Sequence, residues 1–338
     1  MKGLVPLRPA LDGRAGRWRI TRILAGQSWV EGRTSPLAVP GVAVSEGDYL
    51  LAIDGQELKG TDEPYRLLLG TAGRTIRLTV SARPTGEGAR EVSVQPLADE
   101  RELRYYNWVE ANRRAVDKAT GGRVGYVHIP DMEAKGLTEF IRQFYPQVEK
   151  DGLIIDERNN GGGFVSEMIL ERLRRQVVGM SNQREEKSGT YPDAAVSGPM
   201  ALLVNEYAGS DGDIFPYYFR EYGLGPIIGT RTWGGVVGIR GDPFFGMVDG
   251  GYTYVAEFGL YNLKQRWVVE NEGISPDIEV DNLPRDVAAG RDPQLQRAIA
   301  EVLRRIEAAK PVRPSSPPSR DLRSPVPHSW PTPAAHSP

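Results

Sequence analysis

The sequence predicts an α/β protein in which a small β-rich unit precedes a larger unit built around a parallel sheet. Two observations predict this fold class. Between residues 15 and 97, short stretches of alternating apolar and polar residues are separated by glycine-containing turns, which is typical of antiparallel strands. From residue 122 to about residue 281, branched apolar runs alternate with stretches of helical length, which indicates βαβ units with right-handed crossovers.

The first unit is expected to contain several strands and one short helix. The strands are residues 17–24, 46–58 with a turn at Asp54-Gly55, 75–83 and 91–97, and the short helix is 63–70. Residues 1–14 are taken as an N-terminal extension. An amphipathic helix within 98–121, ended by two glycines, is expected to connect the two units.

The second unit, residues 122–309, is expected to be the core domain. Its predicted strands are 123–129, 152–157, 200–205 and 226–231, and its predicted helices are 137–150, 165–178, 212–223 and 292–310. Two further stretches, 251–262 and 265–270, are predicted as antiparallel strands. Residues 310–338 are rich in proline and serine, which predicts a disordered tail.

Composition excludes several kinds of function. The chain has 338 residues, and a net charge of -2 without a long basic run argues against a nucleic-acid partner. No apolar stretch is long enough to cross a membrane. The sequence holds no cysteine and only three histidines, His128, His328 and His336, so we expect no metal centre, no cofactor and no cysteine nucleophile. A cytoplasmic location is consistent with this composition.

Two glycine-containing loops follow predicted strands, at the edge where open parallel sheets bind ligands. Residues 156–163, "DERNNGGG", leave backbone N–H groups unshielded, as an oxyanion cradle requires. Residues 208–213, "AGSDGD", place Ser210 where a strand turns into a helix. Each loop alone is more often a tight turn or a helix N-cap. Neither fits a G-x-S-x-G elbow or a phosphate-binding loop.

Five motifs in the correct order resemble the C-terminal half of tricorn protease homologues, within the tail-specific, or C-terminal processing, serine peptidases. They are "GRVGYVHIPDM", "GLIIDERNNGGGFVSEMI", "NEYAGSDGD", "GTRTWGGVVG" and "VVENEGISPDIEV". Upstream, "SPLAVPGVAVSEGDYLLAIDGQEL" is similar to the PDZ-type domain of the same proteins. The resemblance covers about residues 15–305 and implies a PDZ-like domain at 15–97 followed by a ClpP/crotonase-like peptidase core.

The resemblance also implies roles for individual residues. Ser210 matches the family's nucleophile, and the backbone N–H groups of Gly162 and Asp211 match its oxyanion hole. Glu270 matches the glutamate that supports the proton relay. Without the family, Glu270 reads as a residue of a surface strand. The family further implies peptide substrates, a homo-oligomer and a cytoplasmic setting.

The residue that would take the proton of Ser210 is not evident. Processing peptidases of the other branch use a lysine in a sequence like Thr-Phe-Gly-Lys-Gly, where this chain has "TWGGV", with Gly235 at the lysine position. The tricorn branch uses a histidine from a helical segment upstream of the PDZ domain, which we expect to be missing here. His128, on a predicted strand, is more often a hydrogen-bonded core residue.

Three functions follow from these observations. The first is a tricorn-like serine peptidase that needs a histidine from a missing segment or a partner. The second is a non-catalytic peptide-binding protein, and the third, more remote, is an acyl-CoA enzyme of the crotonase group. An acidic residue for substrate preference cannot be chosen among Glu185, Glu186 and Asp193.

Overall fold

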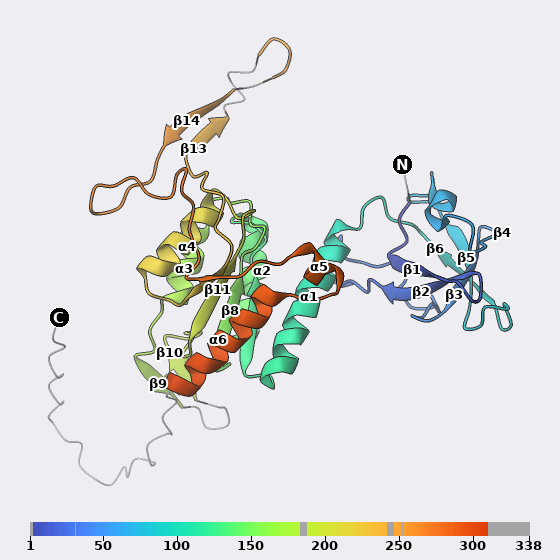
Figure 1. Cartoon of the computed structure of the whole chain (residues 1–338), viewed down its shortest axis with the longest axis horizontal. Helices are drawn as coiled ribbons and strands as arrows, with labels where there is room; N and C mark the ends of the chain where they lie inside the picture. Colours follow the sequence, from blue (N-terminus) through green and yellow to red (C-terminus); the bar gives the residue numbers. More distant parts are fainter. Residues whose placement is uncertain (1–2, 31, 183–187, 242–246, 252, 310–338) are drawn as a thin grey trace, which may run out of the picture. The chain divides into compact units, whose positions relative to one another are not determined.

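The computed structural model describes residues 3–30, 32–182, 188–241, 247–251 and 253–309 (Figure 1). The chain divides into two compact units, with the boundary between Gly122 and Arg123. The predicted tail, residues 310–338, lies outside the described residues, as do Glu185 and Glu186.

The first unit is an antiparallel sheet with strand order β1-β2-β3-β5-β6, in which β4 pairs with β3. This confirms the predicted β-rich, PDZ-like class. Its strands are β1 (Leu7–Asp12), β2 (Arg17–Ile23), β3 (Tyr49–Ile53), β4 (Gln56–Glu57), β5 (Ile76–Ser81) and β6 (Arg90–Val94). A 3₁₀ helix spans Pro64–Leu68, and α1 (Arg101–Thr120) ends at Gly121, which has a left-handed backbone. The connecting helix therefore falls within the first unit.

Strand β1 lies within residues 1–14, which the sequence analysis set apart as an extension. Pro9 obscured the strand, because proline cannot donate a hydrogen bond to a sheet. The structure accommodates it in a strand with a sheet neighbour on one side, where the register to β2 shifts between Arg8 and Pro9. The predicted turn at Asp54-Gly55 is confirmed, since both residues have positive φ angles and join the paired strands β3 and β4.

The second unit contains a parallel sheet with strand order β15-β12-β11-β8-β7, and it confirms the predicted α/β class. The strands are β7 (Val124–His128), β8 (Gly152–Asp156), β11 (Met200–Val204), β12 (Ile227–Gly229) and β15 (Ile278–Glu279). Every residue of β7, β8, β11 and β12 is buried, as expected for a parallel sheet covered on both faces.

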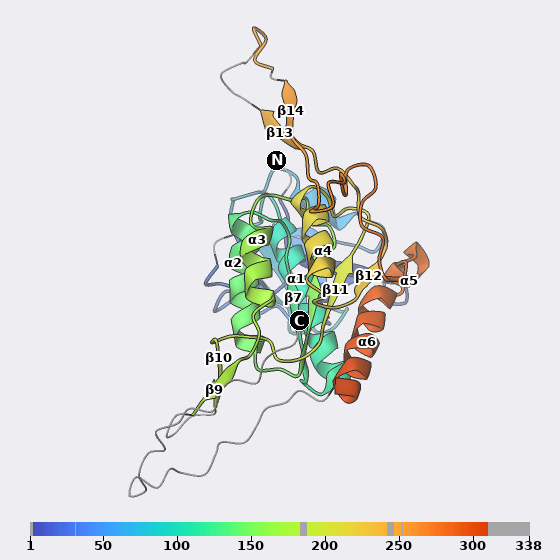
Figure 2. The ribbon, with the colours of Figure 1, turned by 90° about the vertical axis from the view of Figure 1, so that its left-hand side faces the viewer.

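Helices cover both faces of this sheet, as the two views together show (Figures 1 and 2). The helices are α2 (Ala134–Phe144), α3 (Ser166–Leu173), α4 (Asp211–Glu221), α5 (Pro284–Ala288) and α6 (Pro293–Ala309). Apolar residues of α2, α3 and α4 form one core with alternate residues of the strands. Helix α6 packs across the opposite side, with contacts to β7, β8, β11 and β12. In the described part of the chain, no helix is long and apolar enough to cross a bilayer.

Two antiparallel ribbons extend from the second unit. They are formed by β9 (Gly179–Ser181) with β10 (Gly189–Tyr191), and by β13 (Gly238–Gly241) with β14 (Tyr254–Phe258). The predicted strand at 265–270 is wrong. Its only pairing is an isolated bridge between Tyr261 and Trp267, because Val269 and Asn271 have positive φ angles that end an extended backbone.

Candidate active site

Three loops meet at the carboxyl edge of the parallel sheet. They follow β8, β11 and β12, which are neighbouring strands in the sheet order. The loop after β8 carries the three glycines, the loop after β11 carries Ser210, and the loop after β12 carries "TWGGV". The predicted loops therefore lie side by side at the edge that binds ligands in parallel sheets.

Ser210 is the residue immediately before α4, and its backbone is strained. Its φ angle of 57° and ψ angle of -122° are unusual for a residue with a side chain. Its N–H donates to the carbonyl of Gly235 at 3.0 Å. The side chain is half-buried, and no group of the described residues forms a hydrogen bond with its Oγ. The sharp turn presents the hydroxyl at the start of a helix.

Gly162 lies directly against Ser210. A Cβ atom added to Gly162 would stand 2.5 Å from the Ser210 Cβ and 2.9 Å from the Asp211 nitrogen. Real side chains do not approach so closely, so only glycine allows the glycine loop to reach the serine turn. The φ angle of +91° at Gly162 also requires glycine at this position.

The two predicted oxyanion donors differ in their present partners. The N–H of Asp211 has no acceptor among the described residues, as is typical of the first residue of a helix. The N–H of Gly162 donates to Oδ1 of Asn160 at 2.9 Å. A substrate oxygen would have to share or replace that amide oxygen, so the oxyanion role of Gly162 stays a prediction.

Asn160 joins the glycine loop to the serine loop, a role that the sequence analysis missed. Its side chain is buried, and Nδ2 donates to the carbonyl of Ile129 at 3.1 Å. Its own carbonyl accepts the N–H of Gly209 at 2.9 Å. An Asn-Gly pair after a strand is ordinarily a turn signal, so the sequence held no separate indication of this bracing role.

The two acidic residues after Ser210 hold the neighbouring loops. Asp211 accepts the backbone N–H of Ser166 at 3.0 Å and also its hydroxyl, and so binds the first residue of α3. Asp213 accepts the N–H groups of Gly234 and Gly235 at 2.8 and 3.2 Å. Burial raises the pKa of both carboxyl groups, although the bonds that they accept act in the opposite direction.

Glu270 is connected to Ser210 through the "TWGGV" loop. Its Oε2 accepts the N–H groups of Val236 and Val237, both at 2.7 Å. Val236 follows Gly235, whose carbonyl accepts the N–H of Ser210. Glu270 also lines a pocket of about 500 Å³ beside β14. Its place in a proton relay stays a prediction, since the bonds that its carboxyl group accepts from the described residues come from backbone N–H groups.

Glu157 is a buried acid that the sequence analysis did not single out. Its side chain is fully buried, and neither carboxyl oxygen has a hydrogen-bond partner within the described residues. Burial raises its pKa well above the ordinary value, and the nearby charges of Asp213, Asp211 and Asp156 act in the same direction. The burial of Glu157 therefore favours the protonated, neutral form of its carboxyl group.

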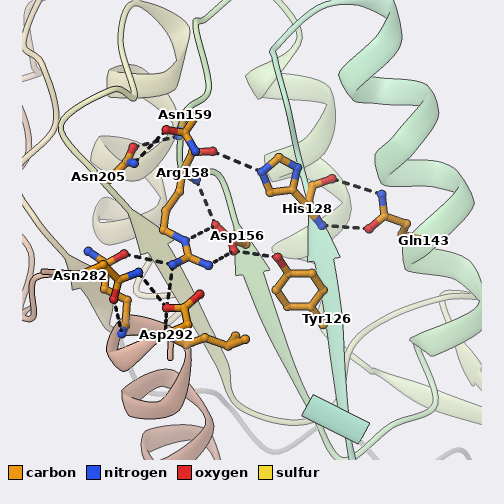
Figure 3. A network of polar contacts seen from close by, with 11 residues as sticks. Tyr126, His128, Gln143, Asp156, Arg158, Asn159, Asn205, Asn282 and Asp292 are labelled. Carbon is orange, nitrogen blue, oxygen red and sulfur yellow. Dashed lines mark hydrogen bonds and ion pairs between the residues drawn. The ribbon is translucent and has the colours of Figure 1, made fainter. Parts of the chain in front are cut away.

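His128 belongs to a buried network of polar contacts (Figure 3). Its Nε2 lies 3.2 Å from the carbonyl oxygen of Arg158, so that nitrogen carries the proton. Burial lowers the pKa of the ring. Arg158 in turn binds Asp156 and Asp292 through its guanidinium group. The network fixes the start of the glycine loop, as the sequence reading of His128 as a core residue anticipated.

Several other candidates are not brought to the site. Asp193 is exposed in the loop after β10, and its backbone carbonyl accepts a bond from Arg175. His328 and His336 lie outside the described residues. Among the residues that are described, no group of three or more acidic or histidine side chains could hold a metal ion.

Comparison with known proteins identifies the family. Residues 123–280 match the model of peptidase family S41, and residues 9–99 match that of the tricorn protease PDZ domain. The chain is 43% identical over 303 residues to tricorn protease homolog 1 of Streptomyces coelicolor, and 41% identical over 308 residues to tricorn protease of Thermoplasma acidophilum. Each alignment covers 90% of this chain and 28% of the relative.

A further relative and a solved structure are also similar to this chain. A Tricorn-like protease C-terminal subunit of Sulfurisphaera tokodaii is 41% identical over 290 residues, which cover 86% of this chain and 33% of that protein. The crystal structure of the tricorn protease superposes with a TM-score of 0.83 at 38% identity, over 90% of this chain and 29% of that one. The chain thus spans about a third or less of these relatives.

The fold and the matched models define the class: the chain carries a core of peptidase family S41, a family of serine peptidases, over residues 123–280. More narrowly, it is a tricorn protease homologue, in which a tricorn-type PDZ domain precedes the S41 core.

Proposed function

We propose that this chain is the peptidase part of a tricorn-type enzyme that hydrolyses oligopeptides, with a base supplied from outside this chain. Ser210 is the nucleophile, the N–H groups of Asp211 and Gly162 bind the oxyanion, and Glu270 supports the proton relay. The observation that carries the proposal is the strained turn at Ser210, with Gly162 against it and the N–H of Asp211 without an acceptor in the described chain.

The absence of a base among the described residues shapes this proposal. Nothing in the described chain hydrogen-bonds Ser210 Oγ, and His128 donates to a backbone carbonyl. A serine hydroxyl needs a base, and losing one member of such a triad leaves only residual catalysis. One relative is named a C-terminal subunit, which supports the idea that this chain works together with a separate polypeptide. Self-association and a cytoplasmic location stay part of the proposal.

A second candidate rests on the same observation. A core that has an oxyanion cradle but no base would bind peptides without cleaving them. A PDZ-type domain, which captures extended chain ends by adding a strand, would fit that role.

Labelling by a fluorophosphonate probe, read by intact mass, tests the proposal. The chain is tried alone and with an upstream helical segment of a tricorn relative, and Ser210→Ala is the control. We expect labelling of Ser210 with the added segment and little without it. No labelling of a folded chain under either condition contradicts the peptidase and favours the peptide-binding protein.

A further inference from the structure

Trp233 lies beside Ser210, although nothing in the sequence analysis gave it a role. The backbone N–H of Trp233 donates to the carbonyl of Ala208, two residues before Ser210, at 2.9 Å. Two residues after Trp233, the carbonyl of Gly235 accepts the N–H of Ser210 at 3.0 Å. These two bonds hold the tryptophan loop along the serine turn.

The indole ring covers the two glycines that adjoin Ser210. A Cβ atom on Gly209 would stand 2.7 Å from Cε3 of the ring, and one on Gly235 would stand 2.6 Å from Cζ3. Neither glycine has a positive φ angle, so the backbone itself does not demand glycine there. Glycine is needed at both positions because a side chain there would occupy the space of the indole ring.

The ring is nevertheless largely exposed. Trp233 retains 66% of its accessible surface, and its indole Nε1 donates to no acceptor within the described residues. Two more exposed aromatic residues lie on the adjoining loops: Phe164, which follows the third glycine and is 84% exposed, and Tyr207, which is 67% exposed. Exposed apolar surface of this kind, next to a reactive group, marks a binding site.

We propose that Trp233 is the floor of a subsite that binds an aromatic or large aliphatic side chain of the peptide, next to the bond that is cleaved. The occupant is the substrate itself, because the ring touches the residues on either side of the serine turn. An indole face held rigidly by backbone offers large apolar contact at little entropic cost. This inference rests on the proposed function, since it assumes that a peptide binds across Ser210.

Peptide binding in the Ser210→Ala background tests the subsite without hydrolysis. Hexapeptides that differ at one position, Phe, Leu, Gly or Asp, are titrated by calorimetry, with that position moved along the peptide. At one position we expect Phe and Leu peptides to bind about tenfold more tightly than the Gly peptide. Trp233→Ala is expected to abolish that preference and Trp233→Phe to keep part of it.

Two further variants distinguish the loss of the subsite from misfolding of the protein. Gly235→Ala retains the indole but displaces it, and should also weaken the preference. Trp29→Ala removes a tryptophan of the first unit that is 77% exposed, and should leave the preference unchanged. An equal preference for Phe over Gly in the parent and in a folded Trp233 variant overturns the inference, as does the absence of peptide binding or of an apolar preference in the parent.

Probe labelling separates this inference from the proposed function. Labelling of Ser210 together with no apolar preference would overturn the subsite and leave the peptidase standing. An apolar preference that depends on Trp233, with no labelling of Ser210 under any condition, would support the subsite in a peptide-binding protein.

Discussion

The N–H of Ser210 donates to the carbonyl of Gly235 at 3.0 Å. Gly235 occupies the position at which the other branch of these peptidases is expected to carry its lysine base. Gly235, which stands in place of the lysine, is therefore in direct contact with Ser210, the expected nucleophile, but has no side chain that could act as a base.

This contact predicts that a Ser–Lys pair can be restored. A lysine at position 235 would place its Cβ against the indole of Trp233, so we expect Gly235→Lys alone to fail. The double variant Trp233→Phe with Gly235→Lys recreates "TFGK" and should be labelled by a fluorophosphonate without an added segment, at least about a hundredfold faster than the parent. Ser210→Ala in the double variant is the control. Equal labelling of the double variant and the parent, both folded, would contradict the prediction.

Neighbouring glycines provide a matched test of the oxyanion loop. Gly162→Ala would force a Cβ to within 2.5 Å of the Ser210 Cβ at a φ angle of +91°, and should abolish labelling even with the added segment. A Cβ at Gly161 would meet nothing within 4 Å, and its backbone is unstrained. Gly161→Ala should therefore label like the parent. The idea fails if the two variants behave alike.

Much of the fold could be predicted from local patterns, whereas the bracing of the site could not. The buried strands and the glycine loop could be predicted because apolar runs and consecutive glycines determine local structure. Asn160, Asp213 and Trp233 act through partners that are distant in sequence. Locally, Asn160 and Asp213 are typical of turns and caps, and Trp233 gives no signal. The positive φ at Val269, which ends a predicted strand, is likewise not indicated locally, because a β-branched residue rarely adopts it.

Glu270 is predicted to stabilise the loop that carries Gly235. Glu270→Ala removes the acceptor of two N–H groups at 2.7 Å and should lower the free energy of unfolding by about 1–2 kcal/mol. Glu270→Gln keeps one oxygen acceptor and should lose less. Urea unfolding of both variants measures the difference, with Glu272→Ala, an exposed neighbour, as the control. A loss no larger than that of Glu272→Ala would show that the two bonds contribute little.

His128 is predicted to affect low-pH stability but not the chemistry at Ser210. Because burial lowers its pKa in the folded protein, the unfolded chain binds the proton first as the pH falls below about 6.5, and stability declines through that range. His128→Gln should flatten this decline, measured by thermal unfolding between pH 7 and pH 5, and should leave probe labelling unchanged. Loss of labelling in a folded His128→Gln chain would make His128 the base.

Glu157 is predicted to make the folded protein less stable as the pH rises. The carboxyl group is buried without a partner in the described chain, and its raised pKa means that the folded protein keeps a proton which the unfolded chain releases above about pH 4.5. The stability that comes from this proton is complete below that pH and is lost progressively at higher pH, up to the pKa of the folded state. Glu157→Gln stays neutral in both states. Its free energy of unfolding should exceed that of the parent at pH 8 by more than it does at pH 5.

Urea unfolding at the two pH values measures this difference, and Glu171→Gln on the exposed face of α3 controls for the loss of a surface charge. The same substitution bears on the site, because Glu157 lies among Asp156, Asp211 and Asp213, which hold the loops around Ser210. These carboxyl groups disfavour a negative charge at position 157 and so favour a neutral side chain there. A Glu157→Gln variant with the same pH slope as the parent would show that the carboxyl group is charged in the folded protein and has found a partner.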